Sequence, residues 1–121
     1  MPAWQNRVTR GDDYRRTVRT GRRVGGATCI VHAVFRSPED PARFGFIVSK
    51  AVGNAVARNL VRRRLKTIAD RALHEGLAGV DIVIRALPAS ATAPFSELEA
   101  ELERSLARAL RTASPQDASS R

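Results

Sequence analysis

The chain has 121 residues, which fits one domain with short tails and excludes a two-domain enzyme. Lys and Arg number 21 against 12 Asp and Glu, and the formal net charge of +9 is typical of proteins that bind nucleic acid or an anionic membrane surface. The single cysteine, Cys29, excludes an intramolecular disulfide. No apolar stretch approaches the roughly 20 residues of a membrane span, and no signal-peptide core is present, so we expect a soluble cytoplasmic protein.

The positive charge is concentrated in two segments. Residues 1–23 hold seven arginines against Asp12 and Asp13, and the basic residues within 58–71 are opposed only by Asp70. These segments must converge in the fold to make one anion-binding surface. We expect three parts in the chain: an irregular basic arm (residues 1–8), a single RNA-binding α/β domain (residues 9–111) and a disordered tail (residues 112–121).

One helix and two strands are predicted in the first half of the domain. Residues 12–20 have the composition of a short helix, with two acids that favour its N-terminal dipole and Gly21 as a stop signal. Residues 29–35 are rich in β-branched and apolar side chains and predict a strand that ends at a proline-containing turn. A second strand over residues 44–49 is expected to pair with it as a hairpin.

The second half predicts a strand between two helices. Residues 54–75 follow a helical period, and Gly76 and Gly79 separate them from an apolar strand over residues 80–84. A loop over residues 88–94 precedes an amphipathic helix over residues 95–113. The predicted order is therefore α-β-β-α-β-α.

The helix over residues 54–75 has two different faces. Exposed helix faces are often charged, but they usually mix the two signs, and this basic face has only Asp70 to oppose it. A bound polyanion explains such uncompensated charge better than solvent exposure alone. The residues expected to face the sheet are Ala57, Val61, Leu65, Ile68 and Ala72, and those on the basic face are Asn59, Arg62, Arg63 and Lys66, with Arg58 at its edge.

A continuous motif begins in the second predicted strand. It reads FGFIVSK over residues 44–50, GNAV over residues 53–56 and RN at residues 58–59, with further basic residues at 62, 63 and 66. This pattern closely resembles the signature of the bacterial ribonuclease P protein subunit. The resemblance extends to Asp13-Tyr14, Gly21 and the Ala86-Leu87-Pro88 segment. It departs at Arg64, where the family is often apolar, and at Lys66, which replaces a common Arg.

The resemblance implies an α+β fold, a two-layer α/β sandwich with a left-handed β-α-β crossover, although such crossovers are normally right-handed. It implies a subunit that joins ribonuclease P RNA and assists Mg²⁺-dependent endonucleolytic removal of the 5′ leader from precursor tRNA. The RNA and its Mg²⁺ are expected to perform the hydrolysis, so no catalytic or metal-binding side chain is predicted in the protein. Neither His32 nor His74 lies in a carboxylate cluster, which agrees with this expectation. No obligate protein partner is inferred.

Two RNA-binding sites follow from the resemblance. The first docks on the catalytic RNA mainly through phosphate contacts, with Gly53 as a turn residue and Asn59 either bonding RNA or fixing its neighbours. Its residues are Lys50, Gly53, Asn54, Arg58, Asn59, Arg62, Arg63 and Lys66.

The second site is a cleft between the first helix and the sheet that receives the single-stranded leader. Strand alternation puts Ile30 and His32 on one face of the strand over residues 29–35. The family often has Phe at the position of Val18 and Tyr at that of His32, so this chain offers less aromatic surface for stacking. The cleft residues are Tyr14, Val18, Ile30, His32, Arg15 and Arg19, and the expected core includes Cys29, Phe44 and Phe46.

Three other functions fit parts of the pattern. A stand-alone ribosomal-type or double-stranded RNA-binding protein accounts for the charge and the α/β pattern. An autonomous nuclease lacks a metal-binding carboxylate set, and a membrane-surface protein lacks a strongly apolar opposing face.

Overall fold

The computed structural model describes residues 6–112, which form an α+β fold, as predicted, around a four-stranded sheet. The order is α-β-β-β-α-β-α, with one strand more than the sequence pattern predicts, and a short 3-10 helix where a loop is expected. The elements are α1 (Gly11–Thr20), β1 (Arg22–Gly25), β2 (Cys29–Phe35), β3 (Arg43–Ile47), α2 (Ala55–His74), β4 (Val80–Ala86), the 3-10 helix η2 (Pro88–Ala91) and α3 (Phe95–Thr112).

The additional strand is β1. A four-residue segment with a glycine and one apolar side chain gives little local strand signal. In the structure it pairs antiparallel with β2, with Arg22 opposite Ala33 and Gly25 opposite Ile30. Its apolar residue, Val24, is 4% exposed and joins the core. Pairing with β2, rather than local preference, makes this segment a strand.

The strand order in the sheet is β1-β2-β4-β3, in which β4 pairs antiparallel with β2 and parallel with β3. The predicted hairpin between residues 29–35 and 44–49 is therefore wrong, because β4 lies between these strands. Six of the seven residues of β4 are buried, and a strand buried on both faces is favoured at the centre of a sheet. The left-handed sense of the β3-α2-β4 crossover stays a prediction from the family resemblance.

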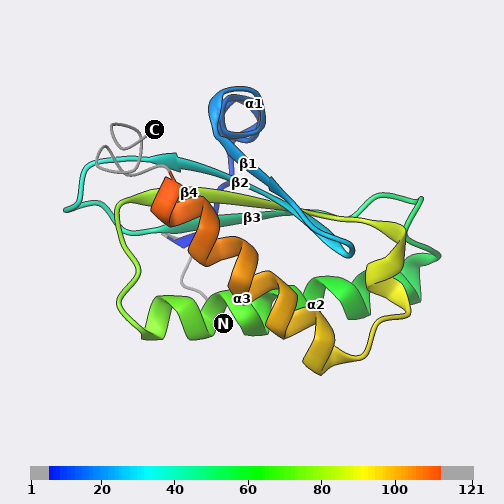
Figure 1. Ribbon diagram of the computed structural model, residues 1–121. Helices are drawn as coiled ribbons and strands as arrows, with labels where there is room; N and C mark the ends of the chain where they lie inside the picture. Colours follow the sequence, from blue (N-terminus) through cyan, green and yellow to red (C-terminus); the bar gives the residue numbers. More distant parts are fainter. Residues whose placement is uncertain (1–5, 113–121) are drawn as a thin grey trace.

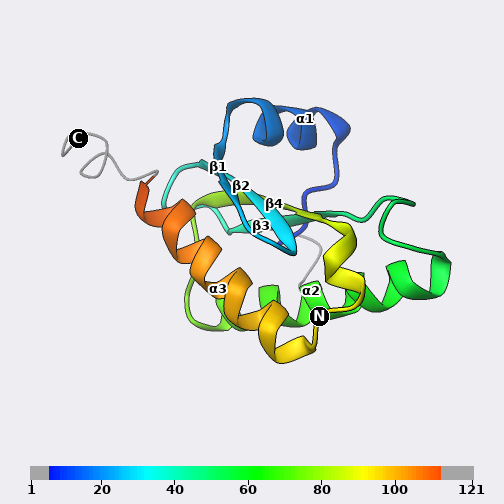
Figure 2. The ribbon, with the colours of Figure 1, turned by 45° about the vertical axis from the view of Figure 1, so that its right-hand side comes forward.

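Helices cover both faces of the sheet. Figures 1 and 2 show α2 and α3 together on one face, where they complete the two-layer sandwich, and α1 alone on the other face. The main core lies between the sheet and α2 with α3. As predicted, α2 contributes Val61, Leu65 and Ile68, each at most 2% exposed. Ala57 and Ala72 are half-buried, and Ala69 is buried in addition.

Three further residues were expected in the core. Cys29 and Phe44 are each 1% exposed, and Phe46 is half-buried against the same core. Burial raises the pKa of the Cys29 thiol to about 11, so this cysteine is an unreactive core residue at neutral pH.

The predicted N-terminal arm is described only from Asn6 onward. The side-chain amide of Asn6 donates to the backbone oxygen of Ala42 at 2.8 Å, and the Val8 N–H donates to the Phe44 oxygen at 2.9 Å. Residues 6–8 therefore follow the outer edge of β3. The predicted tail lies outside the described residues except for Thr112, which ends α3. Within residues 6–112, no helix has the length and apolar content needed to cross a membrane.

Candidate nucleic-acid interface

The motif residues ahead of α2 shape its N-terminus. The Asn54 side chain accepts a hydrogen bond from the Ala57 N–H at 2.9 Å and so caps the helix. Gly53 has a φ of +156°, and a β-carbon there would lie 3.0 Å from the Ala57 β-carbon. Its N–H donates to the Lys50 oxygen at 3.2 Å, which closes the turn. Gly53 and Asn54 thus have structural roles, and Lys50 is exposed in the turn.

The outer face of α2 is basic, as predicted. Its first turn contains no acid, and Asp70 is the only carboxylate in the helix. Asn59 accepts a hydrogen bond from Arg62 Nη1 at 2.9 Å, so Asn59 positions a neighbouring cation. The members of this basic face are the exposed Asn59 and Arg63 and the half-buried Arg58, Arg62 and Lys66.

Arg64 does not belong to the basic face. Its Nη1 donates toward the Ala93 backbone oxygen at 3.4 Å, in the segment between η2 and α3. The departure of this position from the family pattern therefore does not alter the basic face of α2.

Strand alternation and register place three rows of residues on the face of the sheet that carries α1. Contacts of α1 with Asp81 and with Gly45 place this helix over the first two rows, and the third row lies beyond them. The rows run Val34–Asp81–Arg43, then Arg23–His32–Val83–Gly45, then Gly25–Ile30–Arg85–Ile47.

Buried charge holds α1 on the first row. Asp81 is 0% exposed, and Arg43 binds its carboxylate through Nε at 2.8 Å and Nη2 at 2.6 Å. Nη1 of Arg36 lies 3.3 Å from Oδ1 of the same carboxylate, and Nη2 of Arg16 in α1 lies 3.4 Å from its Oδ2. Arg43 also contacts α1 directly, because its Nη1 lies 3.5 Å from Oδ2 of Asp13. This network, which sequence reasoning missed, fixes the position of α1 relative to the sheet.

The predicted cleft residues of α1 are only partly brought together. Tyr14 and Val18 are both half-buried and four residues apart, and the Tyr14 ring packs over Gly45 of β3. Arg15 instead pairs with Asp12 of its own helix, and Arg19 is exposed. The aromatic part of the predicted cleft therefore has a defined place, whereas Arg15 is directed to the helix surface.

The second and third rows supply the other predicted cleft residues. His32 is 4% exposed, and neither ring nitrogen has a hydrogen-bond partner within the described structure. Burial, followed by the nearby charges of Arg23 and Arg85, lowers the pKa of His32 below its ordinary value. Ile30 and Ile47 are half-buried, and Arg85 is exposed. This part of the sheet presents an apolar surface flanked by arginines.

A pocket of about 450 Å³ joins the two predicted sites at the outer edge of β3. It is lined by Tyr14 from α1, by Phe46 from β3, and by Arg62 and Lys66 from α2. Arg7, from the segment along the strand edge, adds another cation. Tyr14 of the predicted cleft and two residues of the basic face therefore border a single depression, although α1 and α2 lie on opposite faces of the sheet.

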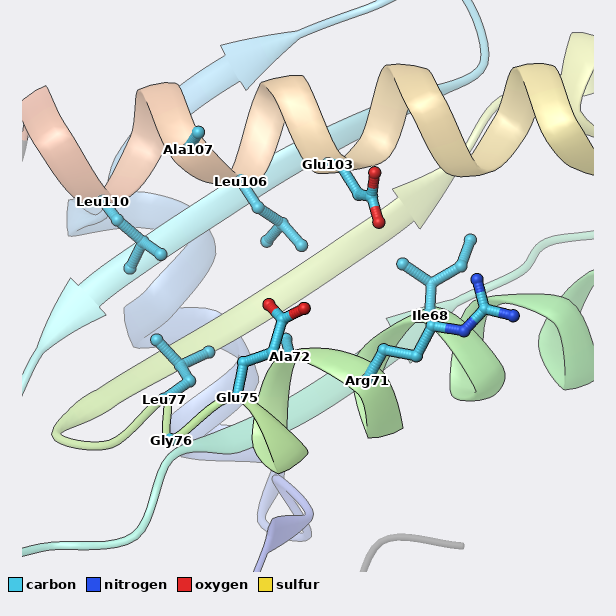
Figure 3. Close-up of a pocket in the computed structure, with 10 residues that line it drawn as sticks. All are labelled: Ile68, Arg71, Ala72, Glu75, Gly76, Leu77, Glu103, Leu106, Ala107 and Leu110. Carbon is cyan, nitrogen blue, oxygen red and sulfur yellow. The ribbon is translucent and has the colours of Figure 1, made fainter.

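A second cavity, of about 520 Å³, lies between the C-terminal halves of α2 and α3. Figure 3 shows Glu103 reaching down from α3 and Glu75 reaching up from α2. Apolar side chains, including Leu106 and Leu110, cover the space between them. Arg71 also lines this cavity but is paired with Glu99, so the carboxylates of Glu75 and Glu103 would repel phosphate and the cavity does not suit RNA.

Comparisons with known proteins agree with the motif. A family model of ribonuclease P matches residues 3–110. The chain belongs to the ribonuclease P protein family. It is 49% identical to the ribonuclease P protein component of Clavibacter michiganensis subsp. michiganensis, across 93% of this chain and 99% of that protein. The corresponding protein of Beutenbergia cavernae is 46% identical, with 88% of each chain covered.

Solved structures show the same architecture. The ribonuclease P protein of Staphylococcus aureus superposes with a TM-score of 0.77 at 26% identity, covering 86% of this chain and 94% of that one. The Thermotoga maritima protein has a TM-score of 0.71 at 20% identity and supports the fold alone. The ribonuclease P protein described here is thus a subunit of an endoribonuclease that processes tRNA, and ribonuclease P RNA is its implied partner.

Several residues of this ribonuclease P protein that border the predicted sites escaped sequence reasoning. Arg85 and Ile47 border the α1 face, and Phe46 and Arg7 border the edge pocket. Alternation along residues 80–86 was the available signal for Arg85, because it puts residues 81, 83 and 85 on one face. Nothing local to the sequence marks the edge pocket.

The described residues offer no evident place for Mg²⁺. In residues 6–112, no group of three or more His, Cys, Asp or Glu side chains is arranged to hold a metal ion. The one fully buried carboxylate described above, Asp81, is already bound by arginines. The side chains of residues 6–112 therefore do not fit a resident metal site, and no step of a reaction is assigned to one.

Proposed function

We propose that the basic face of α2 docks this subunit on ribonuclease P RNA and that the α1 face of the sheet binds the 5′ leader of precursor tRNA. The observation that carries the proposal is the basic face itself, with a glycine turn and an asparagine cap ahead of it and a single acid in the whole helix. Like charges at this density favour an anionic partner, and RNA phosphates supply one.

Docking through α2 is supported by its geometry. Arg63 is exposed. Asn59 holds the Arg62 guanidinium in place, so the donor groups of Arg62 are oriented before RNA arrives. Two apolar side chains, Val56 and Leu60, are 77% and 39% exposed on the first turns of the same helix. A helix face of this kind can bind phosphates and also pack against riboses or unpaired bases.

Leader binding is supported by the α1 face. Tyr14, Ile30 and Ile47 offer apolar and aromatic surface, and Arg23 and Arg85 border it on neighbouring strands. Rings and apolar side chains beside arginines suit single-stranded RNA of any sequence. His32 belongs to the same face of the sheet but is 4% exposed, and both of its ring nitrogens are buried.

The chemistry of leader removal is assigned to the RNA subunit. Mg²⁺ bound mainly by that RNA would activate water and stabilise the developing charge, as the family resemblance implies. The protein would hold the substrate leader and the catalytic RNA in one assembly. We place this assembly in the cytoplasm, where bacterial precursor tRNAs are made.

Leader cleavage of a precursor tRNA at near-physiological Mg²⁺ tests the proposal. The reactions contain protein alone, bacterial ribonuclease P RNA alone, or both. Efficient cleavage only by the combination is the expected result. If the protein adds nothing to the RNA, a stand-alone RNA-binding role replaces the proposal, and cleavage by protein alone would indicate an autonomous nuclease.

A substitution separates the two sites. Tyr14→Ala is expected to weaken binding of precursor tRNA while leaving binding of mature tRNA and assembly with the catalytic RNA unchanged. Equal losses for precursor and mature tRNA would contradict the leader assignment.

A further inference from the structure

We infer that the pocket at the outer edge of β3 is a binding site for one unpaired nucleotide of an RNA chain. This inference rests on the proposed function, because the RNA is either the precursor leader or the catalytic RNA. It adds a site that lies between the two predicted ones and includes Phe46, Arg7 and Thr9, none of which belongs to either.

The charge of the pocket indicates an anionic ligand. Arg7, Arg62 and Lys66 reach it from two different segments of the chain, and none of the nine residues that line it is acidic. Three cations around one depression repel one another unless an anion is bound. The Arg62 guanidinium is additionally fixed by Asn59, so its direction is set before a ligand arrives.

The apolar lining indicates that the ligand also has a flat, unsaturated part. Phe44 and Phe46 stack with ring centroids 6.4 Å apart and an angle of 13° between the rings. Phe44 is 1% exposed and forms the floor, whereas Phe46 is half-buried and has surface available for contact. A nucleobase against Phe46 would leave its phosphate near Arg62 and Lys66, and stacking on aromatic rings is how proteins hold unpaired bases.

The shape of the pocket favours an unpaired base. Phe46 and Tyr14 lie on opposite faces of β3, because Tyr14 packs over Gly45, and the pocket therefore bends around the edge of the strand. Its volume of about 450 Å³ suits a ligand of nucleotide size. A base held in such a depression must leave its helix or come from a single-stranded segment. An RNA chain passing through it would run from the basic face of α2 toward the α1 face.

The test uses the full ribonucleoprotein with precursor tRNA and a tethered iron chelate that releases hydroxyl radicals. Thr9 is exposed and lines the pocket, so Thr9→Cys carries the probe. Cys29 stays unlabelled because it is 1% exposed and its thiol has a pKa of about 11. Probes at Val56→Cys, on the exposed first turn of α2, and at Ala107→Cys, in the cavity between α2 and α3, are the positive and negative controls.

The Thr9 probe is expected to cut a short single-stranded stretch of one RNA. Cuts in the leader identify precursor tRNA as the source of the nucleotide, and cuts in the catalytic RNA identify that subunit. If the Thr9 probe gives no localised cuts while the Val56 probe still cuts the catalytic RNA, the pocket inference is overturned and the proposed function survives. If the Thr9 and Val56 probes cut no more specifically than the Ala107 probe does, the pocket inference and the proposed function both fail.

A pair of substitutions checks that the aromatic ring matters. Phe46→Leu is expected to lower affinity for the RNA that the probe identifies by roughly fivefold or more, the loss of one base stack. Phe46→Tyr keeps the ring and is expected to restore affinity, and thermal unfolding of each variant shows that it is folded. Equal affinities for folded Leu and Tyr variants would overturn the inference.

Discussion

Tyr14 of α1 packs so closely on Gly45 of β3 that a β-carbon added at Gly45 would lie 2.6 Å from two ring carbons of the tyrosine. Real β-carbons essentially never approach other atoms to within 3.0 Å. The position of the tyrosine over the sheet therefore requires glycine at residue 45. This contact connects the first helix, which carries the tyrosine of the proposed leader site, to the strand that borders the edge pocket.

Gly45→Ala is expected to displace the Tyr14 ring and reduce precursor tRNA affinity by about tenfold, the loss of one stacking ring. Affinity for the catalytic RNA should fall less, because the cations of the basic face of α2 are unaltered. Gly11→Ala is the matched control, because Gly11 begins α1 and an added β-carbon there would meet only the flexible end of Arg15, at 3.4 Å. Parallel binding titrations of both variants check this, and an equal loss for both would contradict the role assigned to the Tyr14–Gly45 contact.

Replacing Arg58, Arg62 and Lys66 together with Ala is expected to weaken assembly with ribonuclease P RNA. The dependence of log affinity on log salt should become shallower by roughly 0.7 to 0.9 for each RNA phosphate that the variant no longer neutralises. The measurement is assembly affinity over a series of salt concentrations. Arg104→Ala, an exposed arginine on α3, should leave the slope unchanged. An unaltered slope in the triple variant would rule out the docking assignment.

Asp81→Asn is expected to destabilise the fold. The substitution keeps the shape of the side chain but leaves the Arg43 guanidinium without its buried carboxylate, a loss of about 3 kcal/mol in the free energy of unfolding. Denaturant unfolding measures it. Asp12→Asn is the control, because Asp12 pairs with Arg15 on the exposed side of α1 and should cost far less. Similar losses for the two variants would show that the buried network adds no stability.

Stability is expected to fall as the pH drops below about 6.5, the ordinary pKa of histidine, because of His32. Its pKa is lowered in the folded state by burial and by Arg23 and Arg85, so the unfolded chain takes up the proton first. His32 thus contributes stability above pH 6.5 that is lost as the pH falls through its folded pKa.

The measurement is denaturant unfolding of wild type and His32→Phe between pH 7.5 and 5. The variant should lose less stability across this range than wild type does, whatever other groups titrate there. Identical slopes for the two proteins would show that His32 does not titrate differently on folding.

Local signals in the sequence determined most of the secondary structure and the basic face. The β-branched run of residues 29–35 and the helical period of residues 54–75 each predict an element correctly, because apolar periodicity reports which face an element buries. Arg58, Arg62 and Lys66 share one side of α2 for the same geometric reason. The family resemblance followed from this compact motif, whose residues are close together in the chain.

Tertiary structure alone decided the strand order, the burial of Asp81 and the edge pocket. β1 is a strand because β2 supplies its hydrogen bonds, and β4 lies between β2 and β3 because it is buried on both faces. Asp81 can be buried only because arginines from α1, β3 and the segment after β2 meet at one carboxylate. Tyr14 and Lys66 are far apart in sequence and border one pocket. Such contacts between distant segments depend on packing, which local sequence patterns do not encode.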